Sequence, residues 1–347
     1  MLIEENKPLA PFTTLQVGGP ARYFLEVRSE ADIVEASEWA ETHGLPIFIL
    51  GGGSNLVVSD TGFNGLVLHI AVHGREIIER GSSDQVTFRV AAGEDWDRFV
   101  QSTVEANCAG IECLAGIPGT VGGTPVQNVG AYGQEVGSVI DHVRTFDLCE
   151  RVFVEFSVAE CGFAYRRSRF NASDKGRYVV TRVDFQLKRD GAPTLKYVDL
   201  QRLFAADAKP TLVEVTAAVR RIRHSKGMLL VEGDTDCRSA GSFFKNPIVP
   251  ASTVERIAVV ADKTPPTFPA DDAAHVKLPA AWLIEQAGYQ KGYTRGVTGI
   301  SSRHTLALIN HGDATAAEIL SFAEEVRVAV KARFDVSLEV EPVLVGF

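Results

Sequence analysis

The stretch GIECLAGIPGTVGGTPVQNVGAYGQEVG, residues 110–137, decides how the rest of the chain is interpreted. It is rich in glycine and carries only two charged side chains, Glu112 and Glu135. Flexible linkers combine glycine with serine, whereas these glycines are interleaved with Ile, Val, Leu and Tyr. Backbone that passes very close to something large also needs glycine. The stretch is therefore either a run of structural turns or the backbone cradle of a ligand.

The composition is that of an ordinary globular protein, because 45% of the 347 residues are hydrophobic and 23% are charged. This length predicts two or three domains. A net charge of −9 argues against nucleic acid or an anionic membrane as the main partner. The N-terminal MLIEENKPLAPF lacks the pattern of a signal peptide, and no apolar run approaches the roughly 18 residues of a membrane span. We therefore expect a cytoplasmic protein that binds neither nucleic acid nor a membrane. A monomer with small-molecule partners is also our expectation, but composition does not give the oligomeric state.

The cysteines do not have the spacing of a zinc site, so we predict no metal site. An odd number of isolated cysteines indicates free, buried thiols in a reducing compartment. The five cysteines are Cys108, Cys113, Cys149, Cys161 and Cys237.

The hydrophobic pattern predicts an α+β protein. Residues 23–29 alternate like a strand, 29–44 have helical spacing after the N-cap candidate Ser29, and 45–50 are an apolar strand. Residues 75–190 are mostly strands (85–93, 151–158, 177–187) with one helix within 95–110. The polar stretch 188–211 is a domain boundary or a lid. A basic helix follows at 211–226.

The last helix is predicted within 315–335, and a closing strand within 336–347. The helical spacing places five apolar side chains on one face. They are Ile319, Phe322, Val326, Val330 and Phe334.

A second glycine-rich segment, GGGSN at 51–55, follows a predicted strand. It is neither a P-loop nor a Rossmann fingerprint, because the spacing differs and a β-branched segment follows it. Its backbone N–H groups can still bind an anion, although a hairpin turn explains the segment equally well on its own. The two glycine-rich loops together favour a large, flat ligand with a pyrophosphate. In that interpretation, the glycines leave room for the ligand.

Five segments resemble one enzyme family closely. They are LGGGSNLVVSD (50–60), AGIPGTVGGTPVQNVGAYGQE (115–135), CGFAYRRSRF (161–170), AGSFFKNP (240–247) and LPAAWLIEQAG (278–288). In this order they resemble the UDP-N-acetylenolpyruvoylglucosamine reductases, flavoenzymes of peptidoglycan precursor synthesis. One glycine loop is weak support, but the joint occurrence of all five segments is specific. The resemblance covers nearly the whole chain.

This resemblance implies FAD as cofactor and NADPH as reductant. The expected reaction reduces UDP-N-acetylglucosamine enolpyruvate to UDP-N-acetylmuramate, a step on which cell wall biogenesis, cell shape and cell division depend. The expected fold has an FAD-binding part of the vanillyl-alcohol-oxidase type in two subdomains, at 1–72 with the C-terminal strand 336–347 and at 73–222. A separate α+β substrate-binding domain is expected at 223–335.

The residues implied to bind FAD come from the two glycine-rich loops. They are Gly51, Gly52, Gly53, Ser54, Asn55, Leu56, Gly116, Ile117, Pro118, Gly119, Thr120, Gly122, Gly123, Gln127, Asn128, Gly130, Ala131 and Tyr132.

The chemistry requires a cation and a hydrogen-bond donor at the substrate carboxylate. The ether oxygen of an enol ether opposes hydride addition at the methylene carbon, so the carboxylate end must accept the charge. Arg166 matches the family's carboxylate clamp, since a guanidinium binds a carboxylate bidentately. Glu341 matches a C-terminal glutamate that polarises the same group. Pro342 follows it where the family usually has Val-Arg, so the choice between Glu339 and Glu341 stays open. Ser242 matches the proton donor.

Further residues are implied to bind the substrate: Tyr165, Tyr197, Lys226, Asn246 and Lys277. Tyr197 matches a tyrosine on a mobile loop that only one branch of the family has. Lys226 ends the one dense basic cluster of this acidic chain, and the cluster is also compatible with a solvated helix face. The roles of Arg220, Arg221 and Arg223 stay open, and His304 is interpreted as structural.

Two other functions are compatible with the glycine loops. An oxidase of the same flavin fold would have no reason to carry Arg166, Ser242 and a C-terminal glutamate together. A non-enzymatic nucleotide-sugar-binding protein would be colourless, whereas both enzymes would be yellow with bound flavin.

Overall fold

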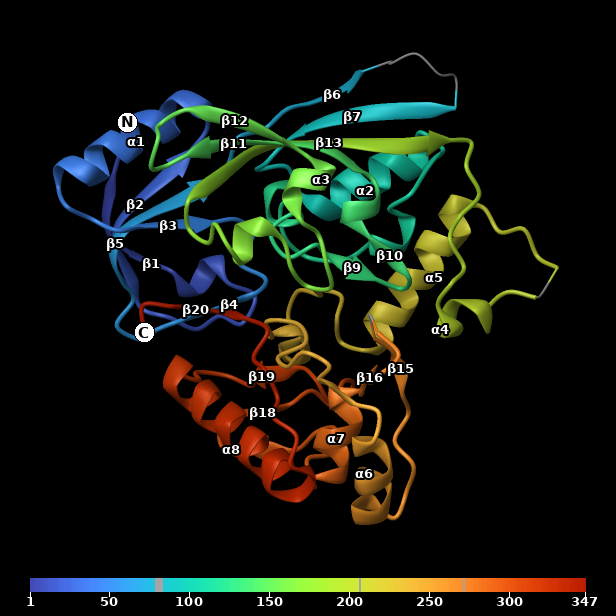
Figure 1. Ribbon diagram of the computed structural model, residues 1–347. Helices are drawn as coiled ribbons and strands as arrows, with labels where there is room; N and C mark the ends of the chain where they lie inside the picture. Colours follow the sequence, from blue (N-terminus) through green and yellow to red (C-terminus); the bar gives the residue numbers. More distant parts are fainter. Residues whose placement is uncertain (79–83, 206, 271) are drawn as a thin grey trace. The chain divides into compact units, whose positions relative to one another are not determined.

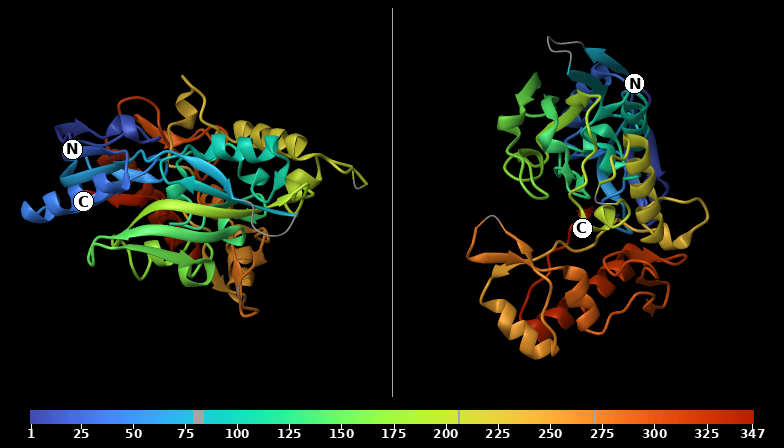
Figure 2. Two further views of the ribbon diagram at one scale, coloured as in Figure 1. Left: turned by 90° about the horizontal axis from the view of Figure 1, so that it is seen from above. Right: turned by 90° about the vertical axis from the view of Figure 1, so that its right-hand side faces the viewer.

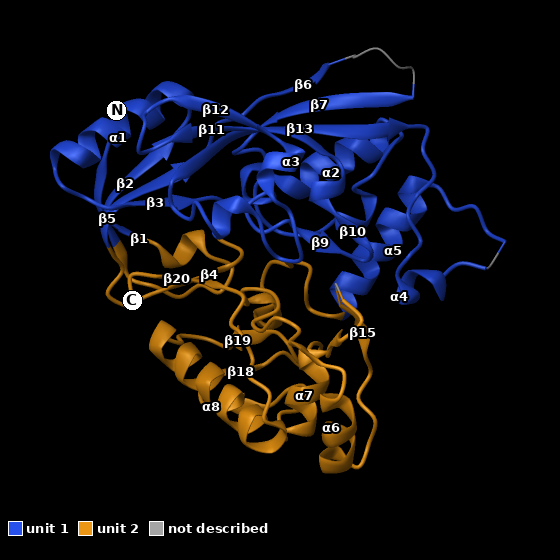
Figure 3. Ribbon diagram, viewed as in Figure 1, with its two compact units in different colours: residues 1–7, 21–52, 64–225 blue, residues 8–20, 53–63, 226–347 orange. Residues whose placement is uncertain are grey.

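The computed structural model describes residues 1–78, 84–205, 207–270 and 272–347. Parts of the predicted strand region (79–83) and of the polar stretch (Ala206) lie outside these ranges. The described chain forms two compact units (Figure 3). Unit 1 comprises residues 1–7, 21–52 and 64–225, and unit 2 comprises 8–20, 53–63 and 226–347. Among the described residues, no helix is both long and apolar enough to cross a membrane.

A small sheet and one helix open the chain. The strand order is β1-β2-β5-β3, with β1 at Glu4–Pro8, β2 at Pro20–Val27, β3 at Ile47–Leu50 and β5 at Phe63–Ile70. The predicted helix is α1, Glu30–Thr42, and Ser29 caps it in a capping box with Asp32. The N-cap prediction is confirmed, and the β-α-β-β order at the start of the chain is found in an extended form.

The larger sheet of unit 1 is antiparallel, in the order β12-β11-β13-β7-β6 (Figure 1). The bounds are β6 Arg75–Ile78, β7 Gln85–Ala91, β11 Ile140–Asp147, β12 Phe153–Ser157 and β13 Tyr178–Arg189, and β8 (Cys108–Ala109) pairs with β13. The three strands predicted at 85–93, 151–158 and 177–187 are therefore confirmed. Trp96 and Phe99 of α2 (Trp96–Glu105) pack against Phe185 of β13 and are fully buried.

Helix α5, Leu212–Ser225, is the basic helix expected at 211–226. It lies beside α2, as Figures 1 and 2 both show. The remaining short elements of unit 1 are η2 Glu112–Leu114, η3 Val121–Gly123, β9 Gly130–Ala131, β10 Gln134–Glu135, η4 Val136–Ser138, α3 Val158–Cys161, η5 Arg169–Asn171 and α4 Val198–Gln201.

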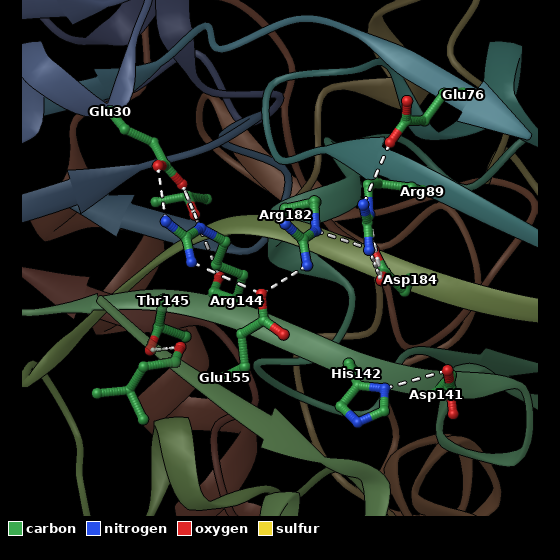
Figure 4. Close-up of polar contacts among 12 residues, drawn as sticks. Glu30, Glu76, Arg89, Asp141, His142, Arg144, Thr145, Glu155, Arg182 and Asp184 are labelled. Atoms are coloured by element: carbon green, nitrogen blue, oxygen red, sulfur yellow. Dashed lines mark hydrogen bonds and ion pairs between the residues drawn. The ribbon is translucent and has the colours of Figure 1, made fainter. Parts of the chain in front are cut away.

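A continuous row of ion pairs crosses unit 1 from α1 to β6 (Figure 4). Asp184 of β13 is only 2% exposed and receives both Arg89 and Arg182, at 3.1 and 2.9 Å. The row in order is Glu30, Arg144, Glu155, Arg182, Asp184, Arg89 and Glu76. Since Glu30 starts α1 and Arg144 lies on β11, the row ties the first helix to the large sheet.

Unit 2 is built around helix α8, Ala316–Phe334, which packs against α6 (Thr253–Ala261) and α7 (Ala280–Gln286). The five apolar residues predicted on one face of α8 are all fully buried. The other elements of unit 2 are η1 Ala10–Phe12, β4 Leu56–Val58, η6 Thr235–Cys237, β14 Ile248–Pro250, β15 Phe268–Pro269, β16 His275–Lys277, β17 Thr294–Arg295, β18 Thr298–Ile300, β19 Leu308–Asn310 and β20 Val343–Val345.

Two expectations need correction. The closing strand is shorter than predicted, because only Val343–Val345 form β20, which pairs in parallel with β4. Pro342 precedes β20, and proline cannot donate to a strand ladder. Cys149 is exposed rather than buried, since it lies in the turn between β11 and β12, whereas the other four cysteines are buried as expected.

Candidate functional site

The two glycine-rich loops meet in unit 1. A Cβ added to Gly52 would lie 2.5 Å from Cα of Gly119, and a Cβ on Gly51 would lie 2.8 Å from Oγ1 of Thr120. Within the described part of the chain, the backbone N–H groups of these four residues have no protein hydrogen-bond acceptor. Unpaired N–H groups gathered on adjacent loops form a nest for an anion such as a pyrophosphate. The first loop crosses the division between the units, since Gly53 already belongs to unit 2.

The glycines of these loops do not all serve to leave room for a ligand. Gly52 allows the two loops to touch, and Gly122 allows η3 to pack on β7, because its Cβ would lie 2.5 Å from that of Ala92. At Gly123, by contrast, the nearest atom is Oγ1 of Thr120 at 4.0 Å. At Gly52 and Gly122 the need for glycine is explained without a ligand, and the cofactor role of these two residues stays a prediction. Close packing of the protein on itself already excludes a side chain there.

Gly116, the first glycine of the AGIPGT turn, is held from both sides by helices α2 and α5. Its N–H donates to Oδ1 of Asp97 at 2.6 Å, and its carbonyl accepts from Nε of Arg223 at 3.0 Å. Arg220 pairs with the same Asp97. Arg223 is 9% exposed, and burial lowers its pKa. Arg223 is therefore buried and binds the glycine loop directly, whereas Arg220, whose side chain is 35% exposed, pairs with the aspartate that holds the loop.

The β9–β10 hairpin connects the glycine stretch to Arg166. Nη1 of Arg166 donates to the carbonyl oxygen of Gly130 at 3.1 Å. Asn128 donates to the carbonyl of Ala164 at 3.1 Å and accepts from the N–H of Gly137 at 2.9 Å. Unit 1 therefore brings the predicted carboxylate clamp to the predicted cofactor loop, although 36 residues separate them in sequence.

Three residues of this region hold an unusual backbone conformation. Asn128, Tyr132 and Arg166 have positive φ angles of 45°, 49° and 53°. A residue with a Cβ pays a penalty of about 1–2 kcal/mol in this conformation. Such outliers cluster at functional sites, where the surrounding structure imposes them.

Tyr197 lies beside the same hairpin. Its ring meets that of Tyr132 edge to face, with the ring centroids 5.1 Å apart. Both Tyr197 and Tyr165 are 38% exposed, and the guanidinium carbon of Arg166 lies 5.8 Å from the centroid of the Tyr165 ring. Two predicted substrate residues and the carboxylate clamp thus surround the hairpin.

In unit 2, the AGSFFKNP segment pairs with the segment that carries Glu341. The N–H of Glu341 donates to the carbonyl of Phe243 at 2.9 Å, and the N–H of Lys245 donates to the carbonyl of Glu339 at 2.9 Å. The side chain of Glu339 forms an ion pair with Lys245 at 2.5 Å and is 72% exposed, whereas Glu341 is partly buried. Lys245 therefore engages the side chain of Glu339, while the backbone of Glu341 is hydrogen-bonded to Phe243, the residue after Ser242.

Asn55 joins the first glycine loop to this same segment. Its carbonyl accepts from the N–H of Val343 at 2.9 Å, and its Nδ2 lies 3.5 Å from the carbonyl oxygen of Glu341. Gly53 is fixed nearby, because its carbonyl accepts from the N–H of Thr14 at 3.2 Å. The second half of GGGSN therefore supports the C-terminal segment, a contact that the sequence pattern did not indicate.

Asn246 and Lys277 lie on neighbouring backbone segments of unit 2. Lys277 pairs with Ile248 across the β14–β16 ladder, and Oδ1 of Asn246 accepts from the N–H of Ala280 at 2.9 Å. That bond caps the start of α7 and uses the amide oxygen of Asn246. Ser242 is partly buried, and within the described residues its hydroxyl makes no hydrogen bond to the protein. Ser242, Asn246, Lys277 and Glu341 thus come from adjoining segments.

A polar cluster that the sequence did not reveal supports Lys226. Asp236 accepts from Nε of Arg303 at 2.7 Å and from the N–H of Ser302 at 2.9 Å. Gly227 rests on this cluster, since its Cβ would lie 3.1 Å from Nε of Arg303. The sequence gives no local signal for this cluster, because Asp236 and Arg303 are 67 residues apart. His304 accepts from the N–H of Leu306 at 3.0 Å, in agreement with a structural role.

The whole chain is similar to known proteins. A family model described as UDP-N-acetylenolpyruvoylglucosamine reductase, C-terminal domain, matches residues 233–345, and one described as FAD binding domain matches residues 21–150. The chain is 47% identical to the UDP-N-acetylenolpyruvoylglucosamine reductase of Streptomyces coelicolor, over 98% of this chain and 90% of that protein. It is 45% identical to that of Thermobifida fusca, over 98% and 97%.

Among solved structures, it is similar to UDP-N-acetylenolpyruvylglucosamine reductase from Thermus caldophilus, with a TM-score of 0.70, 26% identity and coverage of 99% of both chains. The predicted α+β fold with an FAD-binding part is therefore confirmed. The resemblance inferred from the five sequence segments is confirmed as well. The chain belongs to the UDP-N-acetylenolpyruvoylglucosamine reductase family.

Proposed function

We propose that this protein reduces UDP-N-acetylglucosamine enolpyruvate to UDP-N-acetylmuramate with NADPH and bound FAD. Family membership supports the reaction. The observation that carries the site is the convergence, within unit 1, of both glycine-rich loops and Arg166 on one backbone framework. The enzyme then acts in peptidoglycan precursor synthesis, and we expect it to do so as a cytoplasmic monomer on which cell shape and division depend.

The residues of unit 1 fit an FAD. The N–H groups of Gly51, Gly52, Gly119 and Thr120 suit the pyrophosphate, and no protein atom lies closer than 4.0 Å to the position of a Cβ on Gly123. Bound FAD would supply the hydride transfer between NADPH and the substrate. The chain contributes the fixed geometry of the loops, since Asp97 and Arg223 hold Gly116 from both sides.

Arg166 is proposed to bind the substrate carboxylate. Hydride addition to the enol ether moves negative charge onto this carboxylate, and a guanidinium placed there stabilises it more strongly as the charge develops. Nη1 of Arg166 already donates to Gly130, so the arginine is held to the cofactor loop. Glu341 is proposed to share a proton with the same group, as the family match implies, and its backbone N–H donates to the carbonyl of Phe243, the residue after Ser242.

Ser242 is proposed to donate the proton to the carbon next to the carboxylate. A serine hydroxyl is a weak acid, but a carbanion-like carbon is a far stronger base, so a well-placed hydroxyl is sufficient. Its hydroxyl makes no hydrogen bond to described protein groups and is therefore available to a ligand.

The remaining substrate contacts are proposed from the family pattern and from position. Tyr165 and Tyr197 flank the β9–β10 hairpin, and Asn246 and Lys277 adjoin the Ser242 segment. Lys226 is proposed to contact the diphosphate. The proposed domain organisation is an FAD-binding part at 1–72, 336–347 and 73–222, and a substrate-binding domain at 223–335.

The two half-reactions test this function. Under anaerobic conditions, NADPH should bleach the flavin absorbance near 450 nm, and UDP-N-acetylglucosamine enolpyruvate should then restore it. A flavin that stays reduced after the sugar nucleotide is added would show that the substrate assignment is wrong.

Ser242→Ala gives the sharper test of the proton donor. Reduction by NADPH should stay near wild type, and reoxidation by the substrate should slow by about 10²-fold or more. Ser252→Ala, which alters an exposed serine before α6, is the matched control and should change neither half. Equal losses in both halves for Ser242→Ala would contradict its role.

A further inference from the structure

A buried polar cluster in unit 1 links the glycine stretch to the segment that carries Tyr197. Its centre is Glu112, which is 1% exposed. One carboxylate oxygen accepts from the N–H of Thr194 at 2.7 Å and from Nε2 of Gln134 at 2.8 Å. The other accepts from the N–H of Gly110 at 2.8 Å. Three chain segments therefore meet on one buried carboxylate.

Gln134 and Cys113 complete the cluster. Oε1 of Gln134 accepts from the N–H of Cys113 at 2.8 Å, and its Nε2 also lies 3.2 Å from Oγ1 of Thr194. Sγ of Cys113 lies 3.2 Å from the carbonyl oxygen of Thr194. The N–H, carbonyl and hydroxyl groups of Thr194 are thus all engaged, so this residue is fixed to η2 and β10.

The cluster lies between two parts of the proposed site. Gln134 pairs with Ala131 across the hairpin whose Gly130 binds Arg166. On the other side, Tyr197 follows Thr194 by three residues, and its ring packs against Tyr132 at the tip of the same hairpin. Gly133 supports this arrangement, because a Cβ there would lie 2.9 Å from Cβ of Lys196.

Because Thr194 is fixed in this way, the backbone that leads to Tyr197 starts from a defined position. A buried carboxylate is expensive to desolvate, and its hydrogen bonds must offset that penalty. The three donors of Glu112 come from the glycine stretch, the hairpin and the Tyr197 segment, so the cluster holds these three at a set spacing. We propose that Glu112 and Gln134 are positioning residues for the UDP-sugar step, which anchor Thr194 so that Tyr197 is presented beside the β9–β10 hairpin. This inference rests on the substrate role proposed for Tyr197.

A purely structural role would give a different result. If the cluster only stabilises the fold, its loss lowers the melting temperature and leaves the Michaelis constant for the UDP-sugar unchanged in the protein that remains folded. If it positions Tyr197, its loss raises that constant selectively and the effect disappears once Tyr197 itself is gone.

The experiment uses the FAD-loaded full chain and measures four quantities: the KM for UDP-N-acetylglucosamine enolpyruvate, the rate of flavin reduction by NADPH, FAD content and Tm. Glu112→Ala should raise this KM by about fivefold or more, the effect of losing one or two well-formed hydrogen bonds. Flavin reduction should stay near wild type. The KM of Glu112→Gln should lie between those of wild type and Glu112→Ala, because the amide oxygen of glutamine can still accept from Thr194 and Gln134.

Double substitution separates positioning from stability. Glu112→Ala combined with Tyr197→Ala should raise KM no further than Tyr197→Ala alone, since both changes remove one coupled interaction. The control is Asp147→Ala. Asp147 is also buried, at 2% exposed, and accepts from the N–H groups of Cys149 and Glu150, but in the turn between β11 and β12. It should lower Tm without changing KM.

Three outcomes would overturn the inference. If Tyr197→Ala raises KM and Glu112→Ala does not, the positioning role is wrong while the proposed function stands. If Tyr197→Ala leaves KM unchanged, the substrate role of Tyr197 is wrong and the inference falls with it. If effects on KM multiply in the double variant, the cluster acts independently of Tyr197. Should Glu112→Ala fail to fold, Gln134→Ala is judged by the same KM and double-variant criteria.

Discussion

Gly52→Ala tests whether contact between the two glycine-rich loops is what the glycine provides. The new Cβ would lie 2.5 Å from Cα of Gly119 and 2.9 Å from its carbonyl carbon. Carbon atoms normally approach no closer than about 3.5 Å, so the loops must separate by about 1 Å. Such overpacking costs about 1–3 kcal/mol. This free-energy cost lowers either the stability of the protein or its affinity for FAD.

The magnitude can be divided between two measurements. If the loops stay together, the apoprotein Tm falls by a few degrees, because 1 kcal/mol corresponds to roughly 2–4 °C in a protein of moderate size. If they move apart, the Kd for FAD, measured by titrating the apoprotein, rises by about five- to 150-fold. An unchanged Tm together with an unchanged Kd would refute the reasoning from loop contact.

Two matched glycines make the test specific. Gly123→Ala meets no atom closer than 4.0 Å, so it should leave the Tm of the apoprotein unchanged and raise the Kd for FAD only because the ligand needs that space. Gly44→Ala has no neighbour within 4 Å but a φ of +62°, so it should lower stability by about 1 kcal/mol and leave FAD binding unchanged. A wild-type Kd for Gly123→Ala would remove Gly123 from the cofactor site.

Three further predictions concern charge and thiols. Asp184→Asn leaves two arginines facing a neutral group and should lower the free energy of unfolding in urea by about 2 kcal/mol. The control Glu324→Gln, in an exposed pair with Arg327, should change this free energy by less than about 0.5 kcal/mol. Equal effects of the two substitutions would show that burial of the ion pair is not important.

Burial alone would raise the pKa of Asp236, but hydrogen bonds from Arg303, Ser302 and Ser301 outweigh it and hold the pKa below its ordinary value. The ionised carboxylate therefore contributes its full stabilisation above about pH 4 and loses it as the pH falls through the lowered pKa. The difference in unfolding free energy between wild type and Arg303→Leu should accordingly become smaller below about pH 4. If urea unfolding gives the same difference from about pH 6 to about pH 3, this ion pair does not stabilise the protein. Finally, Cys149 is exposed, whereas the other four cysteines are buried and burial raises the pKa of Cys161 to about 12. A thiol reagent at pH 8 should therefore modify one of the five cysteines in the native protein and all five after unfolding. Rapid modification of several thiols in the native protein would be inconsistent with this burial.

Elements set by local pattern could be predicted closely. Ser29 caps α1 because its side chain and Asp32 exchange hydrogen bonds within one turn, and all the partners lie within four residues. The buried face of α8 follows from the 3.6-residue period alone. The closing strand was wrong at its start, since Pro342 interrupts a pattern that hydrophobicity alone continues.

The candidate site residues come mostly from family resemblance, and the structure adds the contacts that individual residues make. Arg220 and Arg223 were undecided in sequence, because a basic helix face looks the same whether it is solvated or turned inward. Two glutamates two residues apart are equivalent by strand periodicity, and the ion pair of Glu339 with Lys245, 94 residues away, could not be predicted from the sequence. Glu112 has no local signal at all, since a lone glutamate is usually exposed.

The amino-acid pattern alone was enough to predict the fold class and the family. The physical reason is that caps, periodicity and glycine-rich turns depend on neighbours within a few residues. Only the tertiary structure decided what the glycine stretch at 110–137 contacts: Gly52 lies against Gly119, Arg223 holds Gly116, and Glu112 joins the stretch to Thr194. Each of those contacts joins residues at least 67 positions apart, so no local pattern encodes it. Gly52 makes room for the backbone of Gly119, which no pattern of nearby residues could indicate.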